Sequence, residues 1–317
     1  MYDSDLFGVQ NPEDGEIGYC CVMGILGEHF ALGVYRGTTG LAGYLRLQSG
    51  ELGMNLDPLA VIFSQQCLMA SFEDRAYLEK RDLSIIKELG LKYRGRNAWP
   101  QFRSHEPGYL PWYVTAAEAR FLTTALEQAM DVAQRFRDDP DLLTPPHPGQ
   151  YLIRVPATTP GGVTWSDQWL APTTMLHPIA AAPKIDEARA RRIKQTIKRR
   201  QGIWEADLFP APTPIQEQKD QRPYYPYMAL LVDHRSGMML PPHLANHQSY
   251  GAEFQSHLLG LFEQMGFLPK EIRVLTQEVV GLLEPLTDLL DIKLQRVKRL
   301  DMLEEARFSM MEYFSRL

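Results

Sequence analysis

The segment from Arg222 to Leu240, RPYYPYMALLVDHRSGMML, constrains the fold more than any other part of this 317-residue chain. Aromatic residues lead into an apolar run, Met228 to Val232, and Asp233, Ser236 and Gly237 then supply residues typical of a turn. The pattern predicts a buried strand that ends at Asp233, followed by a turn and a returning strand. We therefore expect a sheet in the C-terminal part of the chain, with an acidic residue at the end of one strand.

The length of the chain suits two domains better than one core. We predict an α+β protein with a mixed domain over residues 1–180, a basic helix and Pro-rich linker over 181–221, and a small α/β domain over 222–317. In the first domain, residues 15–36 predict a β-hairpin. Thr115 and Glu118 form a T-x-x-E capping box that predicts a helix from Thr115 to Phe136.

The last domain alternates strand and helix patterns, which favours a sheet with parallel pairs and covering helices. We expect Pro285 to interrupt its second helix, either by kinking it or by restarting it. The predicted elements are a basic helix over 184–204, a Pro-rich linker over 209–221, the hairpin over 228–240, a helix over 253–265 closed by Gly266, a strand over 271–275, a helix over 277–290, a strand over 292–297 and a last helix from Asp301.

Composition excludes several classes of protein. The net charge of −6 argues against binding of polyanions by the molecule as a whole, although a local basic patch remains compatible with it. Cys20, Cys21 and Cys67 show no C-x-x-C spacing, which argues against a disulfide framework or a zinc ribbon. Because Cys20 and Cys21 are adjacent in a predicted strand, we expect one to face the core and one to face outward.

The chain shows no signal-peptide pattern at its start, and its apolar runs are shorter than the ~20 residues that a membrane helix needs. We therefore expect a soluble, cytoplasmic protein without a membrane partner.

Residues 93–113, here called the Arg/aromatic segment, contain the candidate binding residues of the first domain. These are Arg94, Arg96, Trp99, Arg103 and Trp112. Such mixtures stack on bases or bind anionic ligands. They also suit a rigid loop whose aromatic rings pack on the domain. We expect Glu73 and Asp74 nearby in either case, as site acids or as partners of the arginines.

The basic helix contributes a second candidate binding surface, formed by Arg191, Arg192 and Arg199. Clustered arginines suit contacts with the phosphates of a nucleic acid. The alternative is a solvated helix face between domains.

The histidines of the last domain offer a weaker candidate. His243 and His247 would share one face of a helix, and such pairs can bind a metal ion. Exposed loop histidines are the alternative.

The phrases DLFGVQNPEDGEIGYCCVMG, SFEDR, GRNAWPQFRSHEPGYLPW, RPYYPYMALLVDHRSG and LPKEIRVL resemble an uncharacterised bacterial family made of two paired domains of unknown function. The last domain also resembles, loosely, the ribonuclease H-like fold of transposases and integrases. That resemblance implies a metal-binding carboxylate at Asp233, with Glu278 and Glu304 or Glu305 completing a two-metal site.

Function is therefore interpreted in two ways. The first is a non-catalytic binding or regulatory protein without a cofactor, whose partner is a nucleic acid or a protein. The second is a metal-dependent nuclease or phosphodiesterase centred on Asp233, with Glu278 and Glu304. The nuclease requires these carboxyl groups to converge, and an Asp233 that caps its own turn argues against it.

Overall fold

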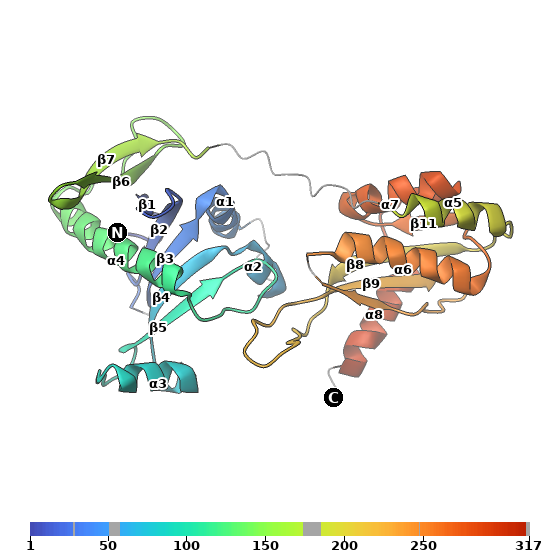
Figure 1. Ribbon diagram of the computed structural model, residues 1–317, viewed down its shortest axis with the longest axis horizontal. Helices are drawn as coiled ribbons and strands as arrows, with labels where there is room; N and C mark the ends of the chain where they lie inside the picture. Colours follow the sequence, from blue (N-terminus) through green and yellow to red (C-terminus); the bar gives the residue numbers. More distant parts are fainter. Residues whose placement is uncertain (28, 51–57, 174–184, 247, 315–317) are drawn as a thin grey trace. The chain divides into compact units, whose positions relative to one another are not determined.

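A computed structural model describes residues 1–27, 29–50, 58–173, 185–246 and 248–314 (Figure 1). The chain divides into two compact units, residues 1–176 and 177–317. Each unit has its own β-sheet, which helices cover. Within the described part of the chain, no helix is both long and apolar enough to cross a membrane.

The N-terminal unit contains one sheet with seven strands among the described residues, in the order β5-β4-β3-β2-β1-β6-β7. Neighbouring strands are antiparallel except β1 and β6, which are parallel. The predicted hairpin is confirmed as β2 and β3. The strands are β1 (Leu6–Gln10), β2 (Ile17–Met23), β3 (Phe30–Arg36), β4 (Cys67–Glu73), β5 (Trp99–His105), β6 (Tyr151–Thr159) and β7 (Gly162–Leu170).

Helices cover both faces of this sheet. The long helix α4 (Ala116–Asp138) crosses one face (Figure 1) and buries Phe121 and Leu122 against Val34 and Leu68. The predicted capping box is confirmed, because Thr115 N–H donates to Glu118 at 2.7 Å and Glu118 N–H donates to Thr115 Oγ1 at 3.3 Å. The other helical elements are α1 (Gly37–Gln48), α2 (Pro58–Ser64), the short 3-10 helix η1 (Arg75–Tyr77) and α3 (Lys80–Glu88).

Because helices cover both faces of the sheet, the expectation that one of the adjacent cysteines faces outward is wrong. Cys20 packs in the cluster under α4, whereas Cys21 packs on the opposite face with Tyr44 of α1. Both cysteines are buried, and neither faces solvent. Burial raises the pKa of Cys21 to about 11 and that of Cys67 to about 12. These two thiols therefore stay protonated near neutral pH and behave as small apolar side chains.

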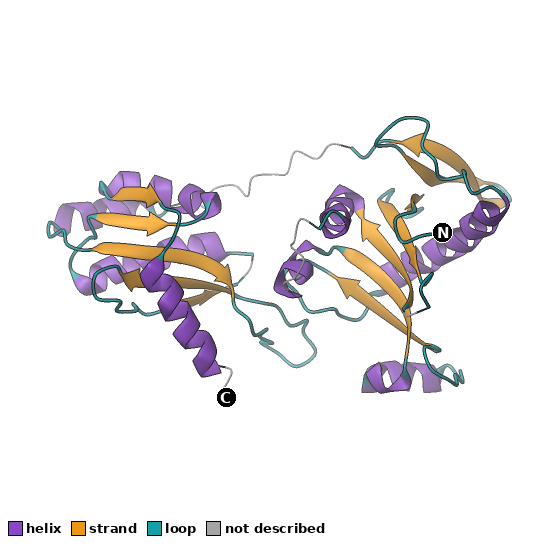
Figure 2. Ribbon diagram, turned by 180° about the vertical axis from the view of Figure 1, so that it is seen from behind, coloured by secondary structure: helices purple, strands orange, loops and turns teal. Residues whose placement is uncertain are grey.

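The C-terminal unit contains five strands among its described residues, in the order β10-β9-β8-β11-β12. Figure 2 shows the strands of this unit in orange among its helices. The central strand β8 is antiparallel to β9 and parallel to β11, and β11 is parallel to β12. The strands are β8 (Ile203–Pro210), β9 (Tyr227–Asp233), β10 (His243–Ala245), β11 (Glu271–Val274) and β12 (Lys293–Arg296), and the helices are α5 (Glu187–Thr196), α6 (Tyr250–Met265), α7 (Gln277–Leu290) and α8 (Asp301–Phe314).

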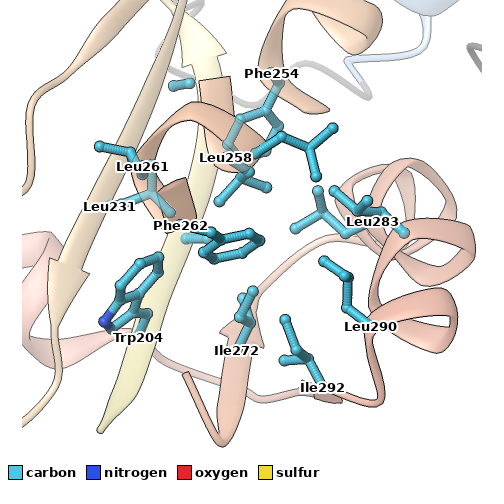
Figure 3. Packing of buried hydrophobic residues seen from close by; sticks show 14 of the residues in the cluster. Trp204, Leu231, Phe254, Leu258, Leu261, Phe262, Ile272, Leu283, Leu290 and Ile292 are labelled. Carbon is cyan, nitrogen blue, oxygen red and sulfur yellow. The ribbon is translucent and has the colours of Figure 1, made fainter. Parts of the chain in front are cut away.

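The larger core of this unit lies between the sheet and helices α5, α6 and α7. Trp204 of β8 is 1% exposed, and its ring stacks on Phe262 of α6 with 5.6 Å between centroids. Figure 3 shows Ile272, Leu283 and the other apolar residues that surround this pair. A smaller core on the opposite face joins β8 and β9 to α8.

The prediction of a continuous basic helix up to Trp204 is wrong, because Trp204 lies in strand β8. The described part of that helix ends at Thr196, and β8 follows with Trp204, Ala206 and Leu208 on one face. Gly202, at φ +76°, lies between the two elements in a conformation that favours glycine. The expected linker therefore begins only after Pro210, and Lys184 lies outside the described residues.

Three smaller expectations also change. The turn after β9 returns through an isolated bridge between Val232 and Met239 rather than through a full strand. His243 belongs to β10 instead of a helix, and His247 lies outside the described residues. Helix α7 runs through Pro285 without a break, because buried leucines before and after the proline hold it against the core.

Candidate functional site

The sheet edge formed by β4 and β5 gathers polar side chains on one face. Met69 pairs with Arg103, and Ser71 pairs with Gln101, so these four side chains share a face. Side chains alternate along a strand, so Phe102 points to the opposite face. The result is a row of polar groups on the face that α1 covers further along the sheet.

These residues line a pocket of about 470 Å³. The sheet supplies its floor, and the segment that follows β5 supplies one wall, including Trp112. That segment is fixed to β5 by two backbone hydrogen bonds between Ser104 and Trp112, of 2.8 and 2.9 Å. The lining consists of His29, Met69, Ser71, Glu73, Glu79, Gln101, Arg103, His105, Leu110, Pro111 and Trp112.

Arg103 is the buried charge at the centre of this site. Its two terminal nitrogens donate to the two carboxylate oxygens of Asp82 at 2.9 and 2.7 Å, and both side chains are less than 10% exposed. Arg103 also donates to the Phe102 carbonyl at 2.9 Å and lies 3.4 Å from Glu79. Such a bidentate pair fixes the plane of the guanidinium group. Arg103 therefore ties α3 to the sheet and is already neutralised by its own domain.

Tyr113 completes this cluster. Its hydroxyl donates to Glu79, and its ring lies 4.8 Å from the guanidinium of Arg103 and 4.2 Å from that of Arg81. Burial, together with the bond to Glu79, raises the pKa of Tyr113 to about 12. Tyr113 therefore stays protonated near neutral pH and holds the Glu79 carboxylate at the pocket.

The structure brings together only part of the Arg/aromatic segment. Arg103 and Trp112 line the pocket, whereas Arg94, Arg96 and Trp99 do not. Arg94 is exposed, and Arg96 is 90% exposed and lies 3.7 Å from Asp74.

Trp99 lies to one side of the pocket. It packs beside Tyr93, and the guanidinium of Arg75 lies 5.6 Å from its ring. Trp99 is the first residue of β5, and its contact with Tyr93 fits the alternative interpretation, in which the aromatic rings of the segment pack on the domain.

Of the two expected acids, only Glu73 lies at the pocket. Glu73 lines the pocket 3.9 Å from His29, but Asp74 accepts a hydrogen bond from the Asn97 backbone. The carboxylates that bind Arg103 are those of Glu79 and Asp82, which the sequence pattern did not indicate.

The basic residues of α5 are engaged by acids of their own unit. Arg189 and Arg192 both bind Glu263 of α6, at 2.7 and 3.1 Å, and Arg191 binds Glu187 at 2.7 Å. The guanidinium of Arg199 lies 5.9 Å from the Phe267 ring. These contacts offset much of the positive charge that would attract a nucleic acid.

Asp233 caps its own turn. Its Oδ1 accepts hydrogen bonds from the backbone N–H of Arg235 and Ser236 and from the Ser236 hydroxyl, at 3.2, 2.9 and 2.8 Å. Although burial raises the pKa of Asp233, these hydrogen bonds and the neighbouring His234 hold it below the usual value.

Glu278 lies apart from Asp233. Glu278 accepts from Tyr250, whose ring stacks on Tyr227 at the far end of β9 from Asp233, a span of roughly 20 Å along the strand. Glu304 lies 3.5 Å from Arg299. Asp233 and Glu278 are therefore not brought into one site. Among the described residues, no three His, Cys, Asp or Glu side chains are placed to hold a metal ion.

Strand β8 also carries two buried carboxylates that the sequence pattern did not indicate. Glu205 is 1% exposed; its carboxylate accepts from Leu303 N–H at 2.9 Å and lies 2.5 Å from Nδ1 of His234. Asp207 is 7% exposed, and burial raises its pKa while the charge of Arg307 opposes the rise. The period-2 pattern of W-E-A-D-L was the available signal, hidden by the basic residues that precede it.

Comparison with known proteins identifies the domains but not their activity. Residues 1–154 match a domain of unknown function, DUF7309, and residues 189–311 match another, DUF6930. The two matches indicate an uncharacterised family with two domains. No curated protein matches the chain.

A solved structure, the HTLV-2 integrase catalytic core domain in complex with magnesium (dimeric form), shares 18% sequence identity with the chain. The similarity covers 35% of this chain and 68% of that one, with a TM-score of 0.25. The two-sheet α/β architecture agrees with the predicted fold class.

Replacing Asp233 with asparagine will lower the free energy of unfolding by about 1 kcal/mol, because charge-assisted hydrogen bonds in the turn are weakened. A carboxyl group with a lowered pKa stabilises the fold above its usual pKa of about 4 and loses this effect as the pH falls through the lowered value. Urea denaturation of both proteins at pH 7 and pH 3 will show the difference shrinking in acid. A Mn²⁺-dependent rise in melting temperature that the variant loses would contradict this role.

Proposed function

We propose that the protein is a binding protein whose N-terminal domain holds a small polar molecule in the pocket beside Arg103. The pocket itself carries the proposal: its volume of about 470 Å³ falls in the range of about 300–1,000 Å³ typical of small-molecule sites. Its lining combines apolar walls, including Trp112 and Leu110, with several convergent polar groups. This mixture suits a ligand that needs both orientation and burial.

The rigidity of the lining supports the same conclusion. Asp82 is held by Arg103 and also accepts from the Glu79 backbone N–H at 2.9 Å, as part of a capping box at the start of α3. Glu79 is in turn bound by Tyr113 and Arg103. A site whose side chains are already fixed loses less conformational entropy when a ligand binds.

The proposal is tested by a ligand screen on the wild type and on a variant whose pocket is blocked by a larger side chain. We expect at least one member of a library of amino acids, amines, sugars, nucleosides and organic acids to raise the melting temperature of the wild-type protein. A ligand present at 100 times its Kd stabilises the folded state by about 2.7 kcal/mol. Gln101→Trp places an indole in the pocket and will abolish the shift.

The matched control is Phe102→Trp. Phe102 is the next residue of the same strand, faces the other side of the sheet and is 41% exposed, so this variant should respond like the wild type. The proposal fails if no compound stabilises the wild type, or if Gln101→Trp and the wild type respond equally.

A further inference from the structure

We propose that the ligand of this pocket is an elongated organic cation with an amino group at each end. This inference rests on the proposed function and adds to it the chemical class of the ligand. It depends on three observations: a second hollow that adjoins the pocket, an excess of carboxylates around the two hollows, and an aromatic wall.

The second hollow extends the site. It has a volume of about 130 Å³ and is lined by Asp3, Met23, Gly24, Ile25, Leu26 and His29. His29 lines both hollows, so they adjoin at this side chain. Asp3 is the acidic residue of the smaller hollow, and Glu73 and Glu79 are those of the larger one. The combined site is therefore longer than a single amino group requires and has an acidic residue in each hollow.

The charges around the site favour a positively charged ligand. Asp3, Glu73, Glu79 and Arg103 line the two hollows, Asp82 pairs with Arg103, and Arg81 reaches the cluster through Tyr113. Four carboxylates against two guanidinium groups leave an excess of two negative charges.

Arg103 does not reverse this balance. Its charge is shared with Asp82, Glu79 and the ring of Tyr113. An anion would have to compete with a buried bidentate carboxylate for the same guanidinium group, whereas a cation meets the acidic residues Glu73 and Glu79 in the lining.

The aromatic wall fits the same class of ligand. Trp112 lines the larger hollow and packs edge-on against Tyr113, 5.3 Å away. Indole rings attract cations through their π-face, with an energy of about 0.5–2 kcal/mol that grows as water is excluded. An ammonium group beside Trp112 would also lie near Glu79, whose partner is Tyr113.

Calorimetric titration at constant ionic strength, with three probes, tests the inference. The probes are spermidine, which carries separated amino groups, n-propylamine, which carries one, and citrate, which is an anion. We expect spermidine to bind the wild type and citrate not to bind. Glu73→Gln should weaken spermidine binding about tenfold, equivalent to about 1.4 kcal/mol. Asp3→Asn should weaken spermidine binding and leave propylamine binding unchanged.

Glu127→Gln is the matched control, since it removes the same charge from an exposed position of α4 outside both hollows. Spermidine binding that falls equally in the control shows attraction to the acidic surface alone and overturns the inference. Binding of citrate, or of only uncharged library compounds, overturns the class of ligand but leaves the binding pocket intact. If neither these probes nor any library compound binds, the proposed function itself fails.

Discussion

Replacing Asp82 with asparagine will lower the stability of the N-terminal unit by about 3–5 kcal/mol, because it leaves the buried guanidinium of Arg103 without its main partner. Asp82 and Arg103 are 9% and 8% exposed, so water cannot take over the lost interaction. The change also weakens the capping of α3. Urea denaturation of the full chain will report the loss, and hydrogen exchange over α3 and β5 will locate it.

Asp131→Asn provides the comparison. Asp131 lies 3.3 Å from both Arg135 and Arg154, but it is 45% exposed, and Asp167 also binds these arginines. Exposed pairs contribute about 0–1 kcal/mol, so this variant should be nearly as stable as the wild type. Equal effects of the two substitutions would show that the Arg103–Asp82 pair is not a fixed buried contact.

Trp204→Ala will destabilise the C-terminal unit by about 3–5 kcal/mol, the usual effect of removing a large aromatic side chain from a core. Trp204 is in contact with the α6 side of the core, where it stacks on Phe262 and meets Phe267 edge-on. Its removal leaves a cavity between β8 and α6. Thermal unfolding followed by circular dichroism should show a much lower melting temperature for this unit.

The control for Trp204 is Phe308→Ala in the same unit. Phe308 lies on α8 and is 72% exposed, so we expect a change within about 0.5 kcal/mol. If the two substitutions have similar effects, Trp204 does not lie in the core and β8 is not the central strand.

Local signals in the sequence predicted the helices and strands whose ends are determined by residues at those ends. The Thr115 capping box lies where predicted, and Gly266 adopts the left-handed conformation at the end of α6, with φ of +66°. The strand ending at Asp233 and the strand near Glu271 are also present. Each of these features depends on contacts within a few residues, which a single sequence records directly.

The central strand β8 was missed because its neighbours conceal it. Lys198, Arg199 and Arg200 precede the strand and continue the basic pattern of α5, so the pattern predicts a helix up to Trp204 and a linker from Phe209. The alternating pattern of W-E-A-D-L is a short strand signal, and pairing with β9 and β11, which come later in the chain, establishes the strand.

The pocket was predicted only in part for a related reason. Arg103 and Trp112 were candidates because arginines and aromatic rings crowd their segment. The acids that fix Arg103 lie 21 and 24 residues earlier, on an element that the sheet edge brings close. Which of several nearby carboxylates meets a given arginine depends on this tertiary packing. The local pattern pointed to Asp74, which lies 3.7 Å from Arg96, but not to the two acids that bind Arg103.

The contact between Glu205 and α8 determines when the C-terminal unit can finish folding during synthesis. Glu205 lies in the central strand, yet the backbone N–H that it accepts from belongs to Leu303, 98 positions later. Leu300 and Leu303 also close the smaller core against Leu230. As the chain leaves the ribosome, the sheet can pair before α8 emerges, but the Glu205 carboxylate then lacks this donor and the apolar face under α8 stays uncovered. The unit therefore passes through an unfinished, aggregation-prone stage that ends only when residues 300–303 become available.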